Sequence, residues 1–118
     1  YEVMAGYARQ LREACRQELQ GLPQRPAEAV SQAARRWMHR DLEKVPAAMR
    51  AQLETARAAL PTADTMVRMR EELRQLWLST NRSREQLAVD LQAWCRRAED
   101  SGIAALRDFS VRLRAARA

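Results

Sequence analysis

The chain has 118 residues, of which 21 are basic and 15 acidic, so its formal net charge is +6 at pH 7. That length suffices for one domain that buries roughly two-thirds of its unfolded surface. No run approaches the ~18 consecutive apolar residues of a membrane-spanning helix, and no signal peptide is visible, so composition favours a soluble, cytoplasmic segment.

The first half of the chain is predicted to be helical, with breaks at glycine and proline. Residues 2–20 repeat apolar side chains every three or four positions, and Gly21 ends this pattern. The same spacing returns over residues 30–45 and 49–60. Because Pro46 lacks a backbone N–H, it breaks or kinks the helix there. The middle is therefore either two helices or one long helix kinked at Pro46.

A fourth helix is predicted to begin after Pro61, with Thr62 or Asp64 as its N-cap, and to end near residues 80–81. Ser83 then caps a fifth helix. Its hydroxyl can accept from the backbone N–H of Gln86, whose side chain can reach back to Ser83 and complete a capping box.

Ser101–Gly102 is predicted to be the hinge of a C-terminal helical hairpin. Gly102 can take the left-handed conformation that ends a helix, and the apolar period resumes at Ile103 and continues to Leu113. Such a short link makes the two helices fold back on each other and share one core.

These patterns predict an all-α bundle of five or six amphipathic helices. Residues 1–118 form a single helical domain, with N-terminal helices in 1–62 and C-terminal helices in 63–118. Because the chain starts at Tyr1 inside an amphipathic pattern, we expect it to be a fragment of a longer protein. The predicted core residues are Trp37, Trp77, Leu91, Trp94, Ile103, Leu106 and Phe109.

The residues themselves indicate no catalytic or metal site. His39 is the sole histidine and falls on the polar flank of its predicted helix, where a surface role is favoured over metal binding. Cys15 and Cys95 lie on apolar stripes, which favours two reduced, buried thiols over a disulfide or a reactive thiol. The sequence therefore predicts a chain without catalytic, metal or cofactor-binding residues.

The basic excess has two interpretations. Acidic residues are interleaved with the arginines, which is typical of a solvated helix face. The closest approach to a basic cluster is Arg35, Arg36 and Arg40, and these are the candidates for contact with an anionic surface, either a membrane or nucleic acid. Because acids are interleaved, we expect DNA binding no tighter than about 10⁻⁴ M near physiological salt.

The C-terminal third resembles the cytosolic tail of bacterial membrane-bound acyl-lipid or acyl-CoA (fatty acid) desaturases of the DesA type. The positions that carry the resemblance are Leu73, Leu76–Trp77, Leu91, Trp94, Ala98–Glu99, Ser101–Gly102–Ile103, Leu106, Phe109 and Leu113. Tyr1, Met4 and Tyr7 are similar to the segment that follows the catalytic domain in that family.

The desaturase resemblance implies a non-catalytic tail at the cytoplasmic side of the bacterial inner membrane. Its parent would be an oxidoreductase of lipid metabolism that inserts a double bond into an acyl chain at a di-iron centre. The histidine clusters that bind iron in the family are absent from this chain. The implied partners are its own catalytic membrane domain, a second copy of itself or an anionic membrane surface, through interaction, oligomerisation or docking.

The W-x₃-A-x₂-SGI-x₂-L-x₂-F pattern is also similar to a helical stretch late in a family of DDE insertion-sequence transposases, over residues 70–114. This second resemblance implies a helical fragment associated with DNA. A stand-alone structural helical domain is a third hypothesis. Transmembrane spans with histidine clusters in a longer reading frame would favour the desaturase, and Asp/Asp/Glu catalytic strands would favour the transposase.

Overall fold

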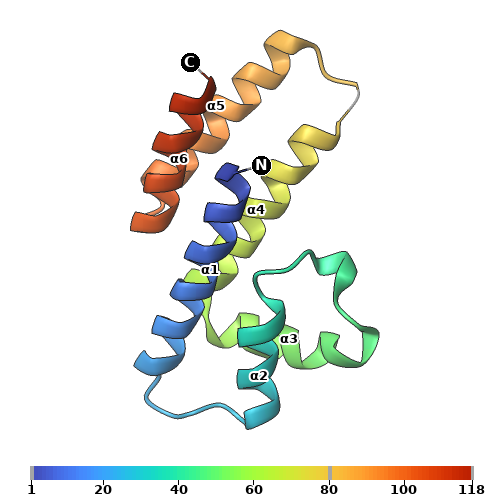
Figure 1. Ribbon diagram of the computed structural model, residues 1–118, viewed down its shortest axis with the longest axis vertical. Coiled ribbons are helices and arrows are strands. Elements are labelled where there is room, and N and C mark those ends of the chain that lie inside the picture. The colour runs from blue at the N-terminus through green and yellow to red at the C-terminus, as the bar shows by residue number, and fades with distance from the viewer. Residues whose placement is uncertain (1, 80, 118) are drawn as a thin grey trace. The chain divides into compact units, whose positions relative to one another are not determined.

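The computed structural model describes residues 2–79 and 81–117, and within these ranges the chain is all-α with no strand (Figure 1). Its helices are α1 (Glu2–Gly21), α2 (Glu28–Trp37), α3 (Arg50–Ala59), α4 (Pro61–Leu78), α5 (Arg84–Asp100) and α6 (Ala104–Arg117). Two single turns of 3-10 helix, η1 (Leu42–Lys44) and η2 (Ala47–Met49), lie between α2 and α3. No helix in these ranges has the length and apolar character that crossing a membrane requires.

The chain forms two compact units, residues 1–67 and 68–118, and the boundary between them falls within α4. In the first unit, α2 and α3 cross each other and are the most extensively packed pair (Figure 1). One stripe of α1 is buried, at Tyr7, Leu11 and Cys15. The Tyr7 hydroxyl donates a hydrogen bond to the backbone carbonyl of Met66, so the core ties α1 to the start of α4.

The N-terminus of α4 is capped from a distance. Neither Thr62 nor Asp64 is the N-cap that the sequence predicts, because the helix begins at Pro61 and both residues lie inside it. The Glu18 carboxylate from α1 instead accepts from the backbone N–H of Thr62 at 3.0 Å and from that of Ala63 at 2.6 Å. Two of the N–H groups that any helix start leaves unpaired are thereby satisfied by a residue of another helix.

The second predicted helix is shorter in the structure than the sequence pattern indicated. It ends at Trp37 and not near Val45, and 12 residues separate it from α3, so neither long helix nor proline kink is present. Asp41 adopts an extended conformation (φ −60°, ψ 133°), in keeping with the preference of Asp for helix boundaries over interiors. Val45 is also extended because it precedes Pro46.

The second unit is built around the hairpin of α5 and α6, which fold back on each other at Ser101–Gly102 (Figure 1). Trp94 lies at its centre, fully buried, and packs edge-on against Phe109 with ring centroids 5.7 Å apart. The indole N–H donates to the Met69 carbonyl of α4 at 2.7 Å. Leu91 and Leu106 complete the buried centre.

Three of the predicted core residues differ from expectation. Trp77 is 44% exposed, because it lies in the last turn of α4 and the first buried residue of α5 is Leu91, well into that helix. Trp37 is half-buried at the end of α2, with arginine side chains against its ring. Ile103 is half-buried because it lies in the link and not within α6.

The predicted capping box at Ser83 forms only in part. The Ser83 hydroxyl accepts from the backbone N–H of Gln86 at 3.0 Å, as expected for an N-cap. The Gln86 side chain, however, donates to Asp90 at 3.0 Å and so does not complete the box. A capping box would require the Gln86 side-chain oxygen to accept from the Ser83 backbone N–H, whereas this side chain bonds along the helix to Asp90.

Gly102 has φ +78°, the left-handed conformation, so we expect Gly102→Val to lower the free energy of unfolding by about 1–2 kcal/mol or more. No atom lies within 4 Å of the position that a Cβ would take there, so the cost comes from the backbone and not from a clash with a neighbour. Gly21→Val is the matched control, since that glycine also has open space but no positive φ. Equal urea-unfolding midpoints for the two variants would contradict a left-handed backbone conformation at Gly102.

Candidate functional site

Two adjoining hollows lie between α1, α2 and the linker that joins them. Their volumes are about 430 and 540 Å³, and both are lined by Arg16 and Arg35. Arg25 lines the first hollow, and Arg9 and Arg12 line the second. We call this surface the arginine groove and define it by Arg9, Arg12, Arg16, Arg25 and Arg35.

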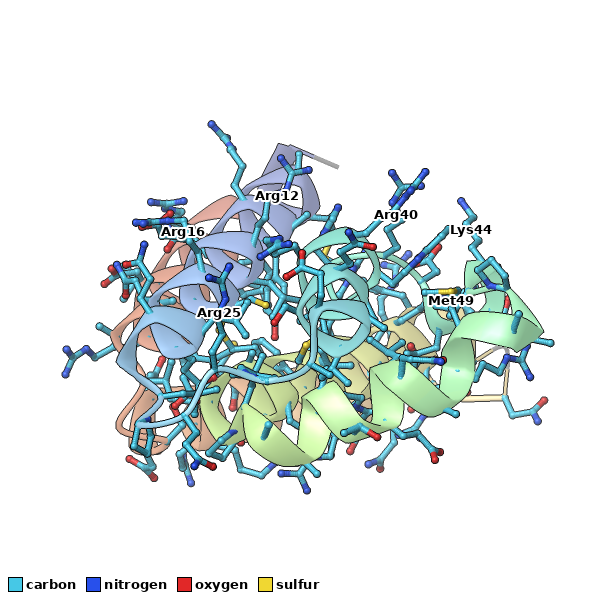
Figure 2. The ribbon with its side chains drawn as sticks, turned by 90° about the horizontal axis from the view of Figure 1, so that it is seen from below. Arg12, Arg16, Arg25, Arg40, Lys44 and Met49 are labelled. Atoms are coloured by element: carbon cyan, nitrogen blue, oxygen red, sulfur yellow. The ribbon has the colours of Figure 1, made fainter. Side chains whose placement is uncertain are left out.

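The groove follows from the periodicity of α1. Arg9, Arg12 and Arg16 are spaced by three and four residues, so they lie on one face of the helix. The other face is held in the core by Leu11 and Cys15. Figure 2 shows Arg12 and Arg16 projecting from α1 toward the same side as Arg40 and Lys44, which follow α2.

Two carboxylates in and beside the groove form ion pairs with its arginines. Arg16 donates to both Glu13 oxygens, and the Nε contact measures 3.1 Å. Hydrogen bonding from Arg16 keeps the pKa of Glu13 below its usual range and raises the pKa of Arg16. Arg35 pairs with Glu28 at 3.2 Å. Five guanidinium groups thus face two carboxylates, so the surface keeps a positive field.

The structure divides the basic cluster that the sequence predicts. Arg35 faces the groove, whereas the guanidinium groups of Arg36 and Arg40 lie over the Trp37 ring, 5.8 and 5.2 Å from its centroid. Stacking on an indole holds these two cations in place at the edge of the same unit. All three arginines are exposed.

Sequence reasoning missed four members of the groove, namely Arg9, Arg12, Arg16 and Arg25. A signal for three of them was present, because Arg9, Arg12 and Arg16 form a basic stripe opposite the apolar stripe of α1. Their convergence with Arg35 and Arg25 depends on how the linker of residues 22–27 returns the chain beside α1.

His39, which the sequence places on the polar flank of its helix, is half-buried. Its Nε2 lies 3.3 Å from Arg12 Nη2, so it contacts the groove from the end of α2. Cys15 and Cys95 are free and buried. Burial, with the Glu18 carboxylate, raises the pKa of Cys15 to about 11, so the thiol stays protonated at neutral pH. Within the described ranges, no three His, Cys, Asp or Glu side chains are grouped to hold a metal ion.

Four large apolar side chains are exposed among the described residues of the second unit. Trp77 and Leu78 end α4, while Val89 and Val111 lie on the outer faces of α5 and α6. They occupy three different helices, and none of them lines the hollow that Glu72, Arg82 and Arg97 form in that unit. The arginine groove is therefore the stronger candidate site.

The family model of the ISL3 group of DDE transposases, described as transposase, matches residues 1–118. No curated protein and no solved structure matches the chain. The family match corrects the inferred resemblance to fatty acid desaturases and to a role in lipid metabolism. Trp94, Ala98, Leu106 and Phe109, which carried that resemblance, are all buried packing positions. Such a pattern is required by a helical hairpin of this kind and does not distinguish between families that contain one.

Proposed function

Because the chain belongs to the ISL3 family of DDE transposases, we propose that it is a helical part of an insertion-sequence transposase that contacts nucleic acid through the arginine groove. The observation that carries this proposal is the convergence of five arginines on two adjoining hollows of one unit. Guanidinium groups bind phosphate oxygens in a bidentate manner, and they keep their charge at every physiological pH.

We propose that the contacts are made to the sugar-phosphate backbone and carry no sequence information. Phosphate contacts position a protein on DNA, whereas base-edge contacts specify sequence. The five groove arginines are exposed cations, and exposed cations contact phosphates whatever the sequence of the bases.

We also propose that this part of the transposase contributes binding surface, with no catalytic residue or cofactor site of its own. The acidic side chains nearest the groove are already engaged. Glu13 and Glu28 pair with Arg16 and Arg35, and Glu18 caps α4. A carboxylate held in this way by an arginine or by backbone N–H groups supports the fold and the shape of the groove.

The proposal is tested by fluorescence anisotropy with a labelled duplex DNA. We expect a Kd of about 10⁻⁴ to 10⁻⁶ M near physiological salt, tighter than composition alone indicated because the groove gathers the charge. If three or four phosphates are contacted, log K should fall with log salt at a slope of about −3 to −4. A parallel titration with phosphatidylglycerol vesicles in the same buffer measures how tightly the chain binds an anionic surface that is not nucleic acid.

Matched variants distinguish the effect of the groove arginines on DNA binding from the effect of net charge. Arg9→Gln/Arg12→Gln removes two groove cations, and Arg84→Gln/Arg107→Gln removes two exposed arginines of the second unit. We expect the groove variant to bind DNA at least tenfold more weakly, with a salt slope smaller in magnitude by about 2. The control should change the Kd by less than about threefold. Equal losses in the two variants would show that net charge alone drives binding and would contradict the groove.

A further inference from the structure

The lining of the first hollow of the arginine groove includes a largely buried serine, Ser31. Ser31 is 2% exposed and lines the hollow, and its backbone N–H is used within α2 by the Ala27 carbonyl at 3.0 Å. Among the residues that the structure describes, none pairs with the Ser31 hydroxyl. A hydroxyl in this setting has a donor and acceptors to offer to a bound group.

Three arginines line the same hollow as Ser31. Arg16 comes from α1, Arg25 from the linker and Arg35 from α2, and all three line the same hollow of about 430 Å³. Arg16 is oriented by Glu13 and Arg35 by Glu28, so two of the three guanidinium groups are held in position before any ligand arrives. In the described part of the chain, no carboxylate pairs with Arg25.

The linker and the start of α2 support an anion at the same place. Pro26 lines the hollow and directly precedes Ala27, the N-cap residue, whose side chain makes no capping hydrogen bond. The positive end of the ten-residue helix α2 therefore lies beside the hollow without a side-chain cap. The hollow therefore combines guanidinium and hydroxyl donors, and it lies beside the positive end of α2.

We infer that this hollow is a built seat for one phosphate group of a nucleic acid backbone, formed by Arg16, Arg25, Arg35 and Ser31. The inference rests on the proposed function and adds to it a specific contact, distinct from the diffuse charge of Arg9 and Arg12. A tetrahedral oxyanion offers oxygens both to forked guanidinium donors and to a hydroxyl. The hollow exceeds the size of a single phosphate, which leaves room for the adjoining sugars.

The seat is tested with single variants in the same labelled-duplex assay. Ser31→Ala should weaken DNA binding about three- to tenfold at an unchanged salt slope, because the hydroxyl carries no charge and displaces no counterion. Arg25→Gln should weaken binding about tenfold and reduce the magnitude of the slope by about 1. Arg25→Lys should restore the slope without restoring the affinity, because lysine keeps the charge and loses the fork. Circular dichroism melting of each variant shows whether the fold is retained.

The source of the phosphate is resolved by NMR titration with three probes: duplex DNA, a 5′-phosphorylated single strand and inorganic phosphate. We expect the Arg25 Nε–H signal to shift with DNA at concentrations where inorganic phosphate has no effect. Wild-type affinity in Ser31→Ala and in Arg25→Lys, beside weakened binding in Arg9→Gln/Arg12→Gln, would overturn the seat and leave the groove intact. Absence of DNA binding by the wild-type chain, with Arg25 shifted by inorganic phosphate alone, would instead overturn the proposed function.

Discussion

Replacing Trp94 with alanine is expected to lower the free energy of unfolding by about 3–5 kcal/mol, the range for deleting a buried aromatic side chain. Trp94 is fully buried between α4, α5 and α6. The substitution removes the edge-on contact with Phe109 and leaves a cavity that the surrounding helices fill only in part. Urea unfolding followed by circular dichroism at 222 nm measures the loss.

Trp77→Ala is the matched control for Trp94→Ala, because it deletes the same side chain from a site that is 44% exposed. We expect it to cost less than about 1 kcal/mol. Trp94→Phe separates packing from hydrogen bonding, since it keeps an aromatic ring and loses the bond of 2.7 Å to the Met69 carbonyl. Comparable losses for Trp77→Ala and Trp94→Ala would contradict the core placement of Trp94.

Removing the remote cap of α4 is expected to have the second largest effect. Glu18→Ala deletes two charge-assisted hydrogen bonds, to the backbone N–H groups of Thr62 and Ala63, and removes a negative charge from the positive end of the helix. Partial access to water offsets part of the loss, so we expect about 1.5–3 kcal/mol. The same urea titration measures it.

Glu13→Ala is the control for Glu18→Ala, because Glu13 lies on the same helix and its ion pair with Arg16 is on the surface. Exposed ion pairs contribute little to stability, so this variant should unfold close to the wild type. Glu18→Gln keeps one acceptor oxygen, so its free energy of unfolding should lie between those of Glu18→Ala and Glu13→Ala. If Glu18→Ala and Glu13→Ala have the same free energy of unfolding, the Glu18 carboxylate does not cap α4 in solution.

The proposed seat and the cap share a structural cause. Both depend on how α1 lies against the chain that returns to it, α2 in one case and the start of α4 in the other. Cys15 lies on the buried stripe of α1 between these two faces. Core packing of α1 therefore positions Arg16 toward the groove and Glu18 toward α4, and a variant that loosens this helix should affect stability and DNA binding together.

Local features of this protein could be predicted from its sequence. The all-α class follows from apolar spacing, since a helix needs one apolar stripe to bury. Ser83 as N-cap and Gly102 as the left-handed link follow from the chemistry of single residues. Helix ends at Gly21 and before Pro61 follow for the same reason, and Arg35 in the candidate site was found because it lies in a run of basic residues.

Features that join distant segments came only with the tertiary structure. Thr62 and Asp64 are residue types that often cap helices. The backbone N–H of Thr62 nevertheless donates to the carboxylate of Glu18, which lies 44 residues away in the sequence. Trp77 fits an apolar stripe, but whether a stripe is covered depends on what packs against it. Arg9, Arg12, Arg16 and Arg25 become a groove only when the linker of residues 22–27 brings α2 beside α1, because charges converge through the path of the whole chain and not through spacing within one helix.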